Sequence, residues 1–243
     1  MSNPHAEFTR SGYRRLLRHA KSRYRFISFH ESESGPGSCI WRHDVDMSPQ
    51  AAKATGIIEA NEGVSAIYFF NLRSPFYNLF EASVIKIVHF LHSLGHEIGL
   101  HFDASILETH DAGSMVAALE REKGAFEALL QIPSRAFSFH NPGEHTKSFT
   151  ESSYAGMVNA YSTTFASNFS YCSDSNGYWR FTPLESFINA GHPSIYVLTH
   201  PEWWTPRAMA PRARVVRAVR GRAKAVLADY DERMQRAGRK NVR

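Results

Sequence analysis

The chain has 243 residues, of which 43% are hydrophobic and 21% are charged. These values are typical of one large globular domain with a sizeable core and exclude disordered and collagen-like classes. No stretch approaches the roughly 18 consecutive apolar residues of a membrane-spanning helix, and the basic segment 1–25 lacks the apolar region of a secretory signal. Cys39 and Cys172 alone cannot form a disulfide framework or a thiolate zinc site. We therefore expect a cytoplasmic protein.

The net charge of +5 is distributed unevenly along the chain. Residues 1–25 hold seven Lys/Arg against one acidic residue, and residues 205–243 hold twelve against three. Residues 26–204 hold nine basic and nineteen acidic residues, and eleven of the thirteen histidines. This division predicts a basic helical N-terminal extension (1–25), an acidic body (26–204) and a basic C-terminal helix (205–243).

Short β-prone runs alternate with helical patterns through the body. The predicted strands are 39–43, 66–70, 96–102, 136–139, 170–172, 179–181 and 195–199, and the predicted helices are 48–59, 83–95 and 112–130, with a weakly helical segment at 154–159. Ser48 is a plausible N-cap because Pro49 follows it at the first helical position. This rhythm predicts a parallel sheet. No G-x-G-x-x-G or P-loop motif follows a strand, and the length favours an α/β fold in a single domain, a distorted (β/α) barrel of seven or eight strands.

Polar side chains follow five of the predicted strands. They are His43, Asp44 and Asp46; His101 and Asp103; His140 and Asn141; Asp174; and His200, Trp203 and Trp204. Taken singly, a carboxylate or imidazole at a strand end is more often a turn or a structural residue. In βα folds, however, the carboxyl ends of the strands gather at one mouth. Together these groups predict one site.

Imidazole and carboxylate without thiolate form the ligand set of a catalytic Zn²⁺ or similar divalent cation with an open position. Such a cation lowers the pKa of bound water to about 7 and polarises a carbonyl group. A spare carboxylate can then accept a proton and a spare histidine can donate one. The residue set therefore indicates metal-assisted hydrolysis of an amide or an ester.

Several segments resemble the polysaccharide deacetylase (NodB-homology) superfamily, which includes carbohydrate esterase family 4. The sequence GHEIGLH at 95–101 resembles its most specific motif, and RHDVD at 42–46 resembles its first motif in the HDVD variant. The segments 139–142, 174–179 and 198–200 fall where later motifs of the family lie. The resemblance covers about residues 38–204. It implies a metal-dependent N-deacetylase on a distorted (β/α)₇ barrel.

The resemblance also implies roles for individual residues. Asp44 resembles the general base, and His200 the catalytic acid with Asp174 as its orienting partner. Asp46 and His101 resemble metal ligands, but Ser105 stands where the family has its second metal histidine. We expect His140 to complete the site from the neighbouring strand end, with Asp103 as second choice because it lies on the same strand face as His101.

The remaining candidates are assigned to the surroundings of the site. Asn141, Trp203 and Trp204 are expected to bind substrate, although the two tryptophans could equally belong to the core, and His43 is a further candidate. The predicted activity is removal of N-acetyl groups from a nucleotide- or lipid-linked sugar precursor in surface-polysaccharide synthesis, with zinc as the expected metal.

Two alternatives remain open. One is a member of the fold that binds a sugar or metal without deacetylating. The other is a nucleic-acid or membrane-surface protein that acts through its basic ends. Residues 211–236 combine an apolar stripe with many arginines, as expected for a helix packed on the barrel or lying on an anionic bilayer. We expect the packed helix, with peripheral contact at the inner membrane face as an option, and no nucleic-acid partner.

Overall fold

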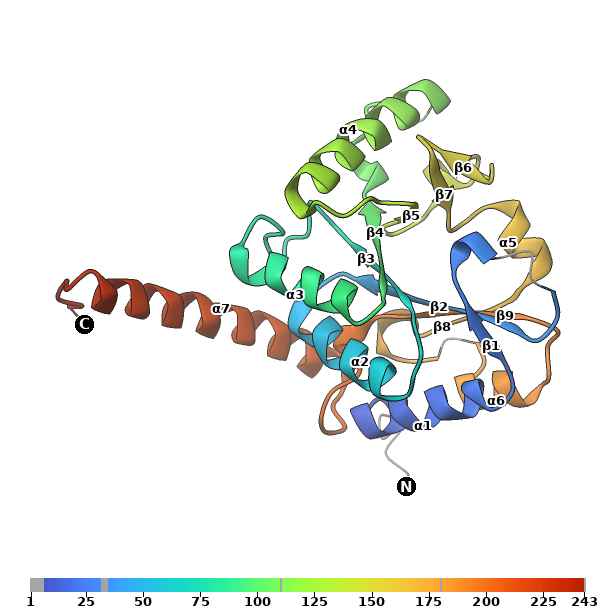
Figure 1. Cartoon of the computed structure of the whole chain (residues 1–243), viewed down its shortest axis with the longest axis horizontal. Helices are drawn as coiled ribbons and strands as arrows, with labels where there is room; N and C mark the ends of the chain where they lie inside the picture. Colours follow the sequence, from blue (N-terminus) through green and yellow to red (C-terminus); the bar gives the residue numbers. More distant parts are fainter. Residues whose placement is uncertain (1–6, 32–34, 110, 180, 243) are drawn as a thin grey trace.

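The computed structural model describes residues 7–31, 35–109, 111–179 and 181–242. Its strands form one curved sheet in the order β6-β7-β5-β4-β3-β2-β9-β8, and β1 pairs with the first half of β2. All pairings are parallel except that of β6 with β7. Helices cover the outer face of the sheet, and α7 projects from the body towards the C-terminus (Figure 1).

The strands and helices alternate along the chain as predicted. The strands are β1 (Arg25–Ile27), β2 (Ser38–Val45), β3 (Ile67–Phe70), β4 (Glu97–Phe102), β5 (Ala136–Phe139), β6 (Ser153–Tyr154), β7 (Met157–Asn159), β8 (Ser170–Ser173) and β9 (Ile195–Thr199). The α-helices are α1 (Arg10–Lys21), α2 (Pro49–Asn61), α3 (Ala82–Ser93), α4 (Ala112–Leu130), α5 (Thr163–Asn168), α6 (Leu184–Asn189) and α7 (Pro211–Arg236). Short 3₁₀ turns lie at η1 (Phe29–Glu31), η2 (Ala104–Ile106), η3 (Glu144–Thr146), η4 (Ser175–Gly177) and η5 (Pro201–Trp203).

The two faces of the sheet bury different sets of side chains. Successive residues of a strand point to opposite faces, so Trp41 of β2 packs into the large core cluster while its neighbour Ile40 packs into a smaller one. The smaller cluster also contains Phe69 and Tyr196 and is covered by Phe165 of α5. Every residue of β2 is buried, and this strand pairs with β1, β3 and β9, so it lies at the centre of the fold.

The described strands form an open barrel, because no pairing among them joins β6 to β8. The predicted distorted (β/α) barrel in a single domain is confirmed. The predicted basic helices are α1 and α7, but α7 does not pack on the barrel along its length as expected: of its residues 211–236, Arg214 is the buried one, and the helix projects from the body (Figure 1). Helix α1 buries Tyr13, Leu16 and Leu17 against the body, and a bridge joins Thr9 to Thr205. The division of the chain at residues 25 and 204 stays a prediction.

Two predicted elements are wrong. Residues 154–159 form the β6–β7 hairpin instead of a weak helix, because Ala155 (φ 51°) and Gly156 (φ 71°) adopt the left-handed conformation that a two-residue hairpin turn requires. The predicted strand 179–181 is absent at Trp179 and Phe181, and Arg180 lies outside the described residues. The indole of Trp179 donates to Glu7 and packs on other aromatic rings instead.

Candidate metal-dependent active site

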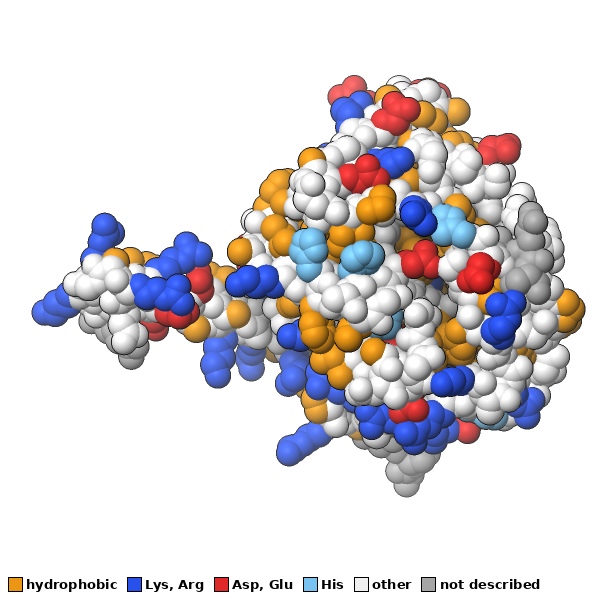
Figure 2. Space-filling model, in the orientation of Figure 1, with side chains coloured by type: hydrophobic (Ala, Val, Ile, Leu, Met, Phe, Trp, Pro, Cys, Tyr) orange, Lys and Arg blue, Asp and Glu red, His pale blue; other side chains and the backbone are white. Residues whose placement is uncertain are grey.

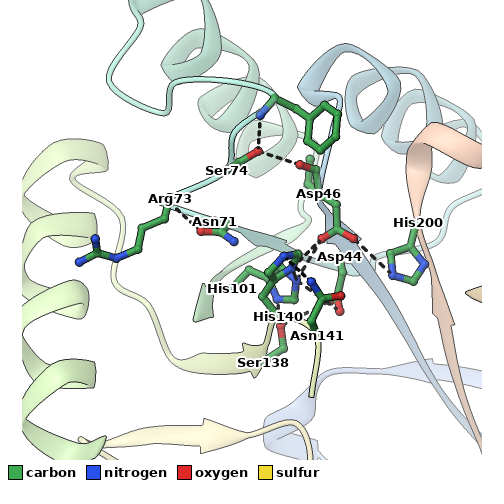
Figure 3. A network of polar contacts seen from close by, with 12 residues as sticks. Asp44, Asp46, Asn71, Arg73, Ser74, His101, Ser138, His140, Asn141 and His200 are labelled. Carbon is green, nitrogen blue, oxygen red and sulfur yellow. Dashed lines mark hydrogen bonds and ion pairs between the residues drawn. The ribbon is translucent and has the colours of Figure 1, made fainter. Parts of the chain in front are cut away.

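A cluster of three potential metal ligands lies at the carboxyl ends of β2, β4 and β5. Nε2 of His101 lies 3.1 Å from Oδ1 of Asp46, and Nδ1 of His140 lies 3.4 Å from the same oxygen. The two imidazole nitrogens are 3.2 Å apart, and one ligand atom from each residue lies within 4.8 Å of the others. Figure 3 shows these side chains pointing towards one another from three strand ends. The structure thus brings together the three residues predicted as metal ligands.

The surroundings orient both imidazoles. Nδ1 of His101 lies 2.6 Å from the hydroxyl of Ser138, which leaves Nε2 to face Asp46. Asn141 has a left-handed backbone (φ 46°), a conformation that asparagine tolerates, and its amide lies 2.9 Å from Nε2 of His140. Metal-binding histidines commonly bond through their second nitrogen to such partners. One carboxylate and two imidazoles, each with its second nitrogen occupied, fit a divalent cation such as Zn²⁺.

The carboxylate and the imidazoles of the cluster shift one another's pKa. Burial would raise the pKa of Asp46, but hydrogen bonds from His101 and His140 outweigh it and hold this pKa well below its usual range. The hydrogen bond to Asp46 raises the pKa of His140 in turn, against the opposing effect of burial. The carboxylate is therefore ionised at neutral pH, as a metal ligand must be.

Asp44 lies beside the cluster as a fixed anion. Arg42 donates from Nε to Oδ1 of Asp44 (2.8 Å) and from Nη2 to Oδ2 (2.7 Å). Burial would raise the pKa of Asp44, but the Arg42 charge outweighs it and lowers this pKa. Oδ2 of Asp44 lies 3.8 Å from Nε2 of His101. The bidentate pair therefore holds an ionised carboxylate next to the proposed metal position.

His200 faces the cluster from the end of β9. Its Nδ1 lies 2.7 Å from Oδ1 of the buried Asp174, and its Nε2 lies 3.8 Å from Oδ2 of Asp46. Burial alone would lower the pKa of His200, but the hydrogen bond and charge of Asp174 outweigh it and raise the pKa to about 10. The imidazolium is thus available as a proton donor at neutral pH.

Asp174 is anchored by more than its histidine. The backbone N–H of His200 donates to both carboxylate oxygens, at 3.0 and 3.1 Å, and Nε1 of Trp204 donates to Oδ2 at 3.1 Å. Burial raises the pKa of Asp174, and the hydrogen bond from His200 opposes that shift. The predicted orienting partner therefore holds His200 by side chain and backbone together.

The second-choice metal ligand, Asp103, lies outside the cluster. Asp103 accepts a hydrogen bond from the backbone of Ser105 as the N-cap of η2. Ser105 is exposed, and Asp103 is not a member of the cluster. The second-choice ligand is thus engaged in a local turn, and the neighbouring strand supplies the third ligand atom through His140.

Three predicted residues are buried. Trp203 and Trp204 are 6% and 1% exposed, so they do not form an open wall for a sugar, and Trp204 supports Asp174 from behind. His43 points to the helix side, where Nε2 lies 2.5 Å from Glu59 and Nδ1 lies 2.8 Å from Thr199. The orientation of His43 follows from its position in β2, because consecutive residues of a strand, here His43 and Asp44, face opposite sides of the sheet.

Sequence reasoning gave Arg42 and Ser138 no role in the site. Both stand two residues before a predicted site residue on the same strand, Arg42 before Asp44 and Ser138 before His140. The two-residue periodicity of a strand places such pairs on one face. That signal could have identified both as partners of the site.

No protein-family model matches the sequence, and no curated protein matches it. Among solved structures, the chain is similar to the chitin deacetylase from the fungal pathogen Colletotrichum lindemuthianum, with 13% identity, a TM-score of 0.45, and coverage of 77% of this chain and 83% of that one. It is similar to the Streptococcus pyogenes deacetylase PplD in complex with acetate, with 12% identity, a TM-score of 0.42 and coverage of 85% of each chain.

A third similar structure is a family 4 carbohydrate esterase pseudoenzyme from Bacillus anthracis. The identity is 14%, the TM-score is 0.44, and the match covers 74% of this chain and 59% of that one. The chain therefore resembles structures of carbohydrate esterase family 4 and its deacetylases.

Proposed function

We propose that the protein is a metal-dependent hydrolase that removes N-acetyl groups from a carbohydrate. The observation that carries this proposal is the convergence of Asp46, His101 and His140 on one point, with an ionised Asp44 and a protonated His200 on its borders. This set contains three metal ligands, a base and an acid. Metal-assisted hydrolysis of an amide uses all three kinds of group.

Asp46, His101 and His140 would hold the divalent cation, with Zn²⁺ the first choice, and a bound cation there lowers the pKa of water and polarises a carbonyl group. Asp44 accepts the proton of the attacking water, and Arg42 keeps its carboxylate in one orientation throughout. His200 donates a proton to the departing amine nitrogen. Asp174 keeps that imidazole charged and directed towards the site.

A catalytically altered protein that binds a sugar or metal without deacetylating is the second candidate, because one of the similar structures is a pseudoenzyme. Metal analysis of the purified chain followed by acetate release from N-acetylated sugars distinguishes the two. Stoichiometric metal and acetate release that both disappear in His140→Ala would support the hydrolase. Bound metal or sugar without acetate release would support the binding protein.

We propose a nucleotide- or lipid-linked sugar precursor of surface polysaccharide as the substrate, met by a cytoplasmic enzyme. The concentration of positive charge in residues 1–25 and 205–243 supports this choice, because such precursors carry phosphate groups that Arg side chains bind well. Acetate release from sugar nucleotides and from lipid-linked sugars, measured side by side, tests it. Higher activity on neutral polysaccharide fragments would contradict it.

We also propose peripheral contact with the inner face of a membrane through α7. No helix in the described ranges is long and apolar enough to cross a bilayer, but α7 exposes Val219, Val226, Leu227 and Tyr230 along one side. Arginines flank this stripe, as in helices that lie on anionic lipid. Leu227→Glu should abolish binding to anionic vesicles, whereas Ala228→Glu, on the opposite side of the helix, should not. Equal binding by both variants would contradict membrane contact.

A further inference from the structure

A cleft of about 460 Å³ separates the first half of α7 from the body. On the body side it is lined by the start of α2 and by the segment around η5, together with Arg10. On the α7 side, small residues such as Ala218 and Gly221 leave it open between cationic side chains. Figure 2 shows Lys and Arg side chains gathered along α7 and around the point where this helix leaves the body.

Two residues that line the cleft lie close in sequence to the active site. Ser48 and Glu202 both line it, and they stand two residues after Asp46 and His200 respectively. Two residues of extended chain span at most ~7 Å. The segments that carry Asp46 and His200 therefore run from the active site to the wall of the cleft.

Six cationic side chains line the cleft: Arg10, Arg214, Arg217, Arg220, Arg222 and Lys224. Of these six side chains, Arg222 forms an ion pair with a residue in the described part of the chain, Glu81 (2.6 Å). The cleft is therefore a concentration of positive charge with little fixed counter-charge.

Arg214 is the most unusual of these cations. It is 1% exposed, donates from Nη1 to the carbonyl of Gly177 (3.0 Å), and leaves Nε and Nη2 without a hydrogen-bond partner in the described structure. A buried charged donor without a partner is costly. Nε of Arg10 is also buried without a partner. Such unsatisfied donors around a cavity indicate a missing acceptor.

The local electrostatics agree with a missing anion. Burial and the nearby charge of Arg217 lower the pKa of Arg10, so two guanidinium groups are held in repulsive proximity. Helix α2 begins at the cleft with Ser48 as its N-cap, and a helix N-terminus carries partial positive charge. Glu202 is the carboxyl group among the cleft-lining residues, and burial together with the charge of Asp46 raises its pKa well above the usual range.

We propose that this cleft is an anion site that binds a phosphate or diphosphate group. In the setting of the proposed deacetylase, on which this part of the inference rests, it would hold the phosphate end of the sugar precursor while the N-acetyl group lies at Asp46. Anion binding itself requires neither the metal nor the reaction.

The test measures binding of pyrophosphate to the full chain by calorimetry. Arg217 is exposed, so Arg217→Gln removes one charge of the cleft without disturbing the core. Arg212→Gln is the matched control, because Arg212 is exposed on the same helix and does not line the cleft. Arg217→Gln should weaken pyrophosphate binding about tenfold, and Arg212→Gln should leave it within about twofold.

Repeating the titration in the His140→Ala background separates the cleft from the metal site. Binding that still depends on Arg217 there supports the cleft, whatever the outcome of the acetate-release assay. Binding that is lost in His140→Ala and unaffected by Arg217→Gln would overturn the proposal, as would equal weakening by Arg217→Gln and Arg212→Gln. Displacement of pyrophosphate by a nucleoside diphosphate or by a short-chain phosphatidate then shows whether the bound phosphate belongs to a nucleotide or to a lipid.

Discussion

The imidazole of His200 and the buried carboxylate of Asp174 lie 2.7 Å apart between Nδ1 and Oδ1, and the backbone N–H of His200 donates to the same carboxylate. The side chain and the backbone of His200 therefore both bond to the carboxylate of Asp174. Since β9 positions the backbone of His200, its ring has little freedom to turn. The other nitrogen faces Asp46, which links the proton donor to the proposed metal site.

Replacing Asp174 with Asn should lower the pKa of His200 from about 10 towards its ordinary value near 6.5. In the wild type the acid form of His200 then persists to high pH, whereas in Asp174→Asn the rate of acetate release should decline above neutral pH. Profiles of kcat against pH for both proteins check this. Superimposable profiles would contradict the assigned pair.

The same shift has a consequence for stability. Because the folded-state pKa of His200 is raised, its ion pair stabilises the fold fully below about pH 6.5 and loses this contribution as the pH rises through about 10. The difference in unfolding free energy between wild type and Asp174→Asn should shrink over that window. Denaturant titrations at several pH values measure it, and a difference that grows with pH would have the wrong sign.

Removing His140 should lower the affinity for Zn²⁺ by more than about 100-fold, because a ligand contributes more than the outer-sphere partners whose loss costs 10–100-fold. Asp103→Asn is the matched control, since Asp103 lies near His101 in sequence but bonds to Ser105. It should retain stoichiometric metal. Metal analysis after dialysis compares the two, and the reverse order of effects would reassign the third ligand to Asp103.

Asp44→Asn should reduce kcat by about 10²–10⁴-fold while metal content stays stoichiometric, because Asp44 is assigned as a base and not as a ligand. The test is whether kcat falls while the metal content does not. Loss of metal together with activity would make Asp44 a ligand, and retained activity would exclude it as the base.

The carboxylate of Glu59 joins α2 to the outer face of the sheet. It accepts hydrogen bonds from the hydroxyls of Tyr13 and Tyr68 and lies 2.5 Å from Nε2 of His43. Glu59→Ala removes the shared anionic partner of these buried groups and should cost about 3–5 kcal/mol of unfolding free energy. Glu185→Ala breaks the exposed pair with Arg15 and should cost under about 1 kcal/mol. Similar losses in the two variants would contradict this account.

The positions of the site residues could largely be predicted from the sequence, because parallel strands end at one edge and polar groups follow each strand. The alternation of side chains along a strand also predicts that His43 and Asp44 face opposite sides of β2. The burial of Trp204 depends on Phe8 and Tyr13, which pack on it from the N-terminal segment, so the local sequence does not decide between core and site.

Other features depend on tertiary placement or on unusual backbone conformations. Arg10 and Arg217 line the same cleft from opposite ends of the chain, and no local pattern connects them. The β6–β7 turn needs a positive φ at Ala155, a residue type that gives no signal for that conformation. Sequence periodicity therefore predicts which side chains a strand directs to each face of the sheet. It does not predict which distant segments pack beside that strand.

A zinc-bound crystal structure with anomalous scattering data tests the central claim most directly. The account predicts one anomalous peak about 2.0–2.2 Å from a carboxylate oxygen of Asp46, Nε2 of His101 and Nδ1 of His140. A peak coordinated by Asp103 in place of His140, or no peak between these three residues, would contradict it.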